Sequence, residues 1–168
     1  IFNMTGFGAG VFMYVGLLAL TMARHFLGAP VEGKMTPTLW VHLAPLSVIP
    51  LSMLALLKTT GDASLLRYGS LVAAAFLGAA LWWLVLAVSM TIRNRRQGKL
   101  PFALSWWAFV FPIGACSVLA FRVSELLALE VLPLVAGGLT LLALFVWSAA
   151  ALGTARGIRT GAIFAPAH

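Results

Sequence analysis

Residues 65–92 read LLRYGSLVAAAFLGAALWWLVLAVSMTI, a continuous apolar run in which Arg67 is the one charged side chain. A transmembrane α-helix needs about 20 such residues to cross a hydrocarbon core roughly 30 Å thick. The run does not alternate apolar and polar residues with a period of two, as the strands of a membrane β-barrel do. It therefore predicts a membrane-spanning helix.

Four other apolar runs of comparable length flank this one. They comprise residues 7–27, 38–57, 104–123 and 126–155. The chain of 168 residues is 62% hydrophobic and 9% charged, whereas a soluble domain carries about 25% charged residues. We therefore predict an all-α, polytopic transmembrane helix bundle with five spans, forming one domain over residues 1–168.

Basic residues punctuate the runs and predict the orientation of the chain. Eight of them fall on one side of the predicted membrane: Arg24, Lys34, Arg93, Arg95, Arg96, Lys99, Arg156 and Arg159. Three fall on the other side: Lys58, Arg67 and Arg122. Because cytoplasmic loops carry the excess of Lys and Arg, we expect the C-terminus to lie in the cytoplasm. We expect the membrane to be a bacterial inner membrane. The basic residues would then set the topology and would not bind nucleic acid.

Prolines divide the five runs into two kinds. Residues 38–57 contain Pro45 and Pro50 and residues 104–123 contain Pro112, all in the interior, whereas the other three runs hold only Pro133, early in residues 126–155. An interior proline removes a backbone hydrogen bond and clashes with the preceding turn, so these two spans should be kinked or broken. Irregular backbone at membrane depth is tolerated only against protein or a water-filled cavity. We therefore predict that these two spans are the inner helices, although ordinary kinks in a packed bundle are the alternative.

The polar residues exclude several classes of chemistry. The four acids lie in loops or at the ends of spans, at Glu32, Asp62, Glu125 and Glu130. A proton relay would place a carboxylate in mid-membrane, and a cation pathway would usually carry acidic rings. No arrangement of a nucleophile with a base is present in the sequence. We expect neither an enzyme nor a metal site, and an anion as the transported species.

Two histidines leave a redox alternative open. His25 ends the first run and His42 lies near the start of the second. Paired histidines on neighbouring helices ligate haem in membrane redox anchors, but such residues also serve as ordinary hydrogen-bonding groups. We expect no cofactor, and His168 in the tail receives no role.

The most specific pattern is LPFALSWWAFVFPIGA at residues 100–115. This stretch resembles the tellurite-resistance/dicarboxylate transporter family, which includes bacterial tellurite-resistance proteins, yeast malate and sulfite transporters and plant slow anion channels. Weaker similarities lie in TPTLWVHLAPLSV at residues 36–48 and in the glycine-containing residues 8–18. The three stretches occur in the order that the family has them.

The resemblance implies a ten-helix protein with five helical hairpins around a central pore, assembled as a homotrimer with one pore in each subunit. The five runs would then be helices six to ten, the C-terminal half. The chain begins at Ile1 within an apolar segment, so we expect it to be part of a longer protein. Odd-numbered helices line the family's pore, and the seventh and ninth are the two proline-containing runs.

The resemblance also implies roles for individual residues. A phenylalanine on the family's ninth helix occludes the pore, and the matching residue is Phe111. An aromatic ring beside a kink can plug a narrow apolar pore. Phe109 should face about 200° away from Phe111 on a helix. Arg93 matches a basic residue that could attract anions, although it could equally be a topology-setting arginine. Small or apolar residues near Phe111 are pore-lining candidates: Ala108, Ala115 and Val118.

Three functions remain open at this point. The first is gated transport of a small anion, namely a C4-dicarboxylate, sulfite, chloride or nitrate. The second is a non-transporting membrane subunit that packs against a larger complex. The third is a haem- or quinone-binding redox anchor that uses the two histidines.

Overall fold

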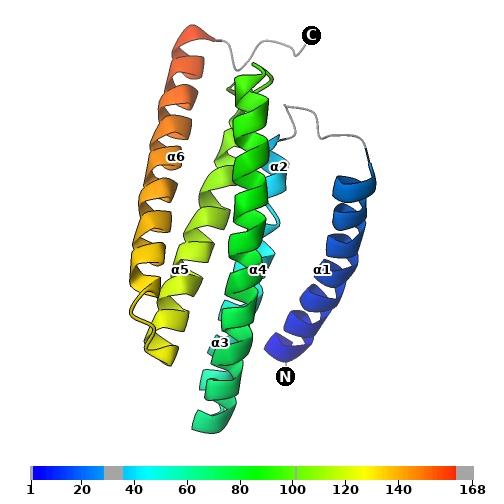
Figure 1. Ribbon diagram of the computed structural model, residues 1–168, viewed down its shortest axis with the longest axis vertical. Coiled ribbons are helices and arrows are strands. Elements are labelled where there is room, and N and C mark those ends of the chain that lie inside the picture. The colour runs from blue at the N-terminus through cyan, green and yellow to red at the C-terminus, as the bar shows by residue number, and fades with distance from the viewer. Residues whose placement is uncertain (1, 29–35, 101, 162–168) are drawn as a thin grey trace.

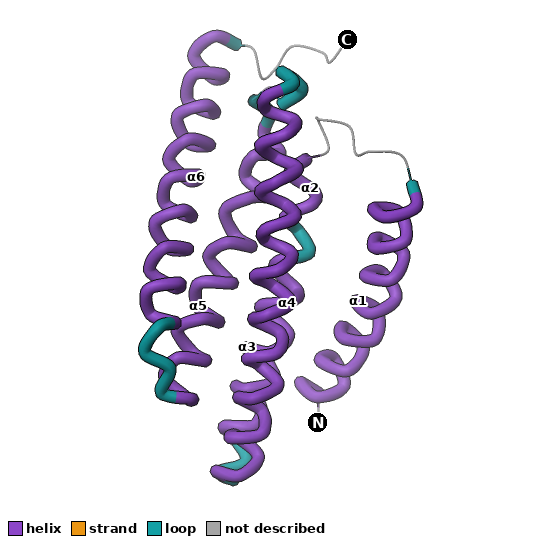
Figure 2. The backbone as a smooth tube through the Cα atoms, viewed as in Figure 1, coloured by secondary structure: helices purple, strands orange, loops and turns teal. Residues whose placement is uncertain are grey.

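The computed structural model describes residues 2–28, 36–100 and 102–161, and within them every regular element is a helix (Figures 1 and 2). Five segments are long and apolar enough to cross a membrane, which confirms the predicted fold class. The elements are α1 (Phe2–Leu27), α2 (Thr36–Trp40), α3 (Leu43–Lys58), α4 (Ala63–Arg96), the 3-10 helix η2 (Leu104–Phe109), α5 (Val110–Leu127) and α6 (Leu132–Thr160). Ile1, Glu32, Lys34 and His168 lie outside the described residues.

The predicted start of the last span at residue 126 is wrong. Helix α5 continues to Leu127, and Ala128 then takes a left-handed conformation with φ 51°, which is a common way for a helix to end. Helix α6 begins at Leu132 with Pro133 in its first turn, where a missing N–H has no cost. Hydropathy did not reveal this turn because residues 126–131 (LLALEV) are almost entirely apolar.

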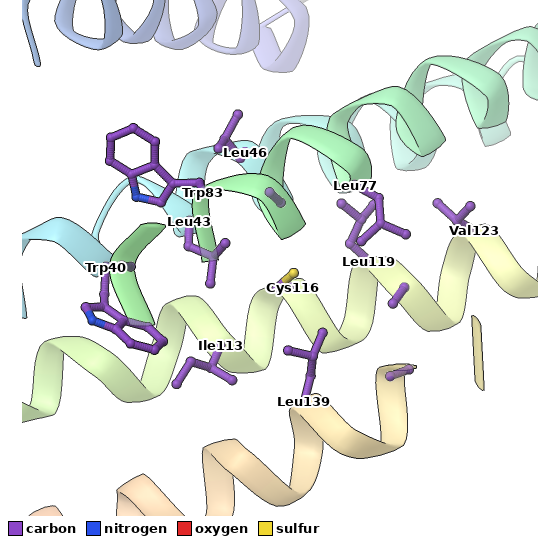
Figure 3. Close-up of a cluster of buried hydrophobic side chains, with 14 of the residues drawn as sticks. Trp40, Leu43, Leu46, Leu77, Trp83, Ile113, Cys116, Leu119, Val123 and Leu139 are labelled. Carbon is purple, nitrogen blue, oxygen red and sulfur yellow. The ribbon is translucent and has the colours of Figure 1, made fainter. Parts of the chain in front are cut away.

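Helix α5 lies at the centre of the bundle and packs against α3, α4 and α6, whereas α1 stands to one side and contacts mainly α3 (Figure 1). The core consists of apolar side chains that these helices direct toward one another (Figure 3). Leu43 from α3 and Ile113, Cys116 and Leu119 from α5 belong to this core, and all four are fully buried. One continuous core therefore holds α3 to α6 together.

The described connections sort to the two ends of the bundle. The turn from α4 to η2 and the end of α6 lie at one end, together with Arg93, Arg95 and Arg159 (Figure 1). The start of α1 and the turns from α3 to α4 and from α5 to α6 lie at the other end. The described bases therefore separate between the two ends, as the topology prediction requires.

Both proline-containing spans are divided in two. The second span breaks at Val41 and His42, and Pro45 is the third residue of the helix that follows. In the fourth span η2 changes to an α-helix at Val110, and Pro112 is again the third residue. A proline at this position cannot bond the carbonyl four residues earlier and clashes with it, which favours a break just upstream. Helix α3 nevertheless continues through Pro50.

Side chains of α4 hold the short helix α2 in place. The carbonyls of the last four residues of a helix lack partners within it, and at membrane depth they need partners from elsewhere. The Trp83 indole N–H donates to the Leu39 carbonyl at 2.7 Å. Two further bonds join α2 to α4: Trp40 Nε1 to Thr91 Oγ1 at 3.0 Å, and Asn94 Nδ2 to Thr36 Oγ1 at 2.7 Å. These bonds tie the broken span to the longest helix.

Candidate functional site

One face of α5 is open although the helix is central. Phe111, Ala115, Val118 and Arg122 follow one another at helical spacing and fall within an arc of about 60° around the helix axis. Phe111 is 65% exposed and Val118 is 50% exposed, while Ala115 is half-buried. No described helix covers this stripe, so the ring of Phe111 projects from the bundle.

The side of this span opposite Phe111 is packed. Phe109 is buried, and its ring meets Trp40 and Trp106 with centroids 5.2 Å and 5.9 Å apart in edge-on geometry. Phe109 and Phe111 therefore point to different sides of the span. Ala108 lies one turn before Phe111 in η2 and is half-buried, and its carbonyl is the one that Pro112 cannot bond.

Helix α3 carries a matching open stripe. Val48 and Ala55 are exposed along it, and they are seven residues apart, so they lie on the same side of the helix. Val41, in the break just before α3, is also exposed. Pro45 lies beside this stripe and is half-buried. The side chains on both stripes are apolar apart from the charged ends, and Phe111 is the largest of them. The two proline-containing spans thus each bury one face in the bundle and leave the other without a partner.

A groove of about 690 Å³ runs between the C-terminal halves of α3 and α5. Its lining includes Leu51 and Ala55 from α3 and Val118 from α5, and two basic residues, Lys58 and Arg122, lie at its charged end. The sequence indicates these two bases only as topology signals. Continuing the α5 stripe from Phe111 by seven and then four residues would have reached Arg122, but the meeting with Lys58 depends on how α3 packs against α5.

Comparison with known proteins gives the chain its family. The family model for voltage-dependent anion channels matches residues 1–155. The chain belongs to this voltage-dependent anion channel family. Two uncharacterised transporters of the archaeon Methanocaldococcus jannaschii are 31% and 30% identical to it over 162 residues. Each match covers 96% of this chain and 47% of the relative. No solved structure is significantly similar.

The family assignment confirms the resemblance seen in the sequence. Together with the five apolar spans, it identifies the chain as an integral membrane protein of a channel and transporter family. The chain spans about half the length of the curated relatives it matches. The open stripes on α3 and α5 therefore belong to a member of the voltage-dependent anion channel family. The matched relatives are about twice as long as this chain.

Arg93 lies exposed near the end of α4. It follows Met90 by three residues and Leu86 by seven, and both of these line a small pocket beside α1. Residues at this spacing share a helix face, so Arg93 belongs to the α1 side of α4. The structure does not bring it to the α3 and α5 stripes, and its part in attracting anions stays a prediction.

The two histidines pack against one indole. The ring centroids of His25 and His42 lie 5.7 Å and 5.0 Å from that of Trp83. The pocket beside His25 measures about 50 Å³, whereas cofactor pockets usually measure about 300–1,000 Å³. The space next to this histidine does not fit a haem. The contacts of His25 and His42 with Trp83 instead join α1 and the break after α2 to α4.

Proposed function

We propose that the full-length protein moves small anions across the membrane through a pathway lined by the open stripes of α3 and α5. The observation that carries this proposal is the stripe on α5, where Phe111 and Val118 stand exposed on the most central helix. A helix surrounded by neighbours on one side and uncovered on the other is what a pore-lining position requires. Membership in the voltage-dependent anion channel family supports the same function.

The remaining wall of the pathway would come from further helices. The matched relatives are about twice as long as this chain. In our proposal the five spans are helices six to ten of a ten-helix pore, and five more helices close it. The subunits form a homotrimer in the plasma membrane, with the C-terminus in the cytoplasm because that end carries the larger number of bases.

Phe111 is the gate in this proposal. Its ring stands on the open stripe beside the junction of η2 and α5, where Pro112 prevents a regular helix. Because no described residue packs over the ring, its side-chain rotamer can change without repacking the core. An apolar constriction closes a pore by excluding water and ions, and a change of the ring's rotamer would open it.

The lining suggests a pathway without tight binding. Ala44, Val48 and Ala55 on α3, Ala108 on η2, and Ala115 and Val118 on α5 are uncharged and small. Selection among anions would then follow their size and the cost of removing their water. Chloride, nitrate, sulfite and C4-dicarboxylates are the proposed substrates.

Modification of single cysteines tests the pathway. Val118→Cys on the α5 stripe should lose anion current when a water-soluble thiol reagent is added, because the added group stands in the pathway. Val85→Cys is the control, since Val85 on α4 is 64% exposed but lies on a different helix face. Cys116 is buried and should give little background reaction.

Equal effects at the two positions would contradict the assignment of the pathway. If the folded, full-length protein carries no anion current at all, the protein is a non-transporting subunit and the proposed function is wrong.

A further inference from the structure

The α3 and α5 stripes end in positive charge at the end of the bundle away from Arg93. Lys58 is the last residue of α3, and Arg122 lies in the last two turns of α5. Both line the groove of about 690 Å³ between the two helices, together with Ala55 and Val118. The groove is therefore continuous with the surface that carries Phe111.

The two bases differ in their surroundings. Arg122 donates from Nη1 to Glu125 Oε2 at 3.0 Å, and both side chains are more than half exposed. Within the described part of the chain, Lys58 has no carboxylate within 4.0 Å. Asp62 is close in sequence, but its carboxylate caps α4 by accepting from the backbone N–H groups of Ser64 and Leu65. The charge of Lys58 is thus the less compensated of the two.

The distance to the gate limits what these bases can do. Arg122 is eleven residues beyond Phe111, which corresponds to about 16 Å along the axis of α5. Direct contact with an anion at the gate is therefore excluded. Charges at the mouth of a narrow cleft act instead by raising the local concentration of the opposite charge. The C-terminal ends of α3 and α5 carry partial negative charge, which would repel an entering anion. Lys58 and Arg122 offset this charge.

We propose that Lys58 and Arg122 form an anion-binding vestibule at this end of the pathway, with Glu125 reducing its positive charge. The vestibule takes small inorganic or carboxylate anions weakly, through charge and the Arg122 guanidinium. This inference rests on the proposed function for its place in transport, but the electrostatic potential in the groove can be measured without any transport.

A cysteine reporter measures that potential. Ala55 is exposed and lines the groove, so Ala55→Cys is introduced into the full-length protein. The rates of its modification by an anionic and by a cationic methanethiosulfonate reagent are compared at about 0.1 M and 1 M salt, where charges act over about 10 Å and 3 Å. The anionic reagent should be favoured, and adding Lys58→Gln and Arg122→Gln should lower the ratio of rates by roughly three- to tenfold at the lower salt.

The matched control is Arg67→Gln. Arg67 is an exposed base on α4 at the same end of the bundle, outside the lining of this groove. It should leave the ratio nearly unchanged, and Lys58→Arg should retain it. A reporter that does not react, or a ratio that falls no further with the double substitution than with Arg67→Gln, overturns the vestibule.

Measuring anion current distinguishes failure of the vestibule from failure of the proposed transport function. If the vestibule and the pathway are both right, the double substitution lowers anion current entering from this end at low salt and has little effect at 1 M. If anion current is normal and the reporter ratio is insensitive to Lys58 and Arg122, the vestibule alone is wrong. If the ratio responds but the protein carries no current, the groove binds anions and the proposed transport function is wrong.

Discussion

Replacing Trp83 with phenylalanine should destabilise the protein by about 2–3 kcal/mol. The indole is 2% exposed and donates its N–H to the Leu39 carbonyl at 2.7 Å, at the end of α2. Phenylalanine keeps an aromatic ring against His25 and His42 but removes the donor. Leaving a buried carbonyl without its partner costs about 1–3 kcal/mol, and side-chain hydrogen bonds in a membrane protein are worth about 0.6 and at most about 1.7 kcal/mol. The smaller ring adds about 1 kcal/mol through lost packing.

Trp82 provides the control for this substitution. It is the neighbouring residue, its ring lies 6.3 Å from that of Trp83, and it is 49% exposed. Trp82→Phe should change the free energy of unfolding by less than about 0.5 kcal/mol. Both variants of the full-length protein are unfolded in mixed micelles with increasing denaturing detergent and followed by circular dichroism. If Trp83→Phe is as stable as Trp82→Phe, the bond to Leu39 does not hold the broken span, and the account of α2 fails.

Two further predictions follow from single residues of α5 and its end. Ala128→Gly should stabilise the protein by about 0.5–1 kcal/mol in the same unfolding assay, because Ala128 has φ 51° and glycine adopts this conformation without strain; Ala150→Gly, inside α6, should instead destabilise it by about 1 kcal/mol. A loss of stability in Ala128→Gly would contradict the assigned conformation. Glu125→Gln removes the carboxylate 3.0 Å from Arg122 and should raise anion current about twofold at 0.1 M salt; a decrease would mean that Glu125 acts by holding Arg122 in place.

Hydropathy and proline placement predicted much of this fold. A long apolar run has few alternatives to a membrane-spanning helix, because any other backbone would leave polar groups unpaired in lipid. The breaks near Pro45 and Pro112 follow from the proline ring, which clashes with the carbonyl four residues earlier and offers it no N–H. The turn at Ala128 was missed because it is built from apolar residues, and a left-handed alanine has no sequence signal comparable to that of glycine.

Properties that depend on packing between helices could not be predicted. Once Phe111 is chosen, helical spacing predicts which residues of α5 share its face, and Arg122 is one of them. Lys58 joins it only because α3 packs beside α5, and no local pattern reports that pairing. The contact of Trp83 with Leu39 likewise links residues 44 positions apart. Phe111 was selected through the family resemblance, since spacing alone does not distinguish a gate from an exposed aromatic residue.

Anion current in planar bilayers, compared between Phe111→Ala and Phe145→Ala, tests whether Phe111 gates an anion pathway. Phe111 on the α5 stripe is 65% exposed, and Phe145 on α6 is 70% exposed, so each substitution removes a comparably exposed ring. We expect a large rise in anion current for Phe111→Ala in the full-length protein and a current close to wild type for Phe145→Ala. Equal currents in the two folded variants would contradict Phe111 as the gate, and no anion current in wild type or in either variant would contradict the pathway itself.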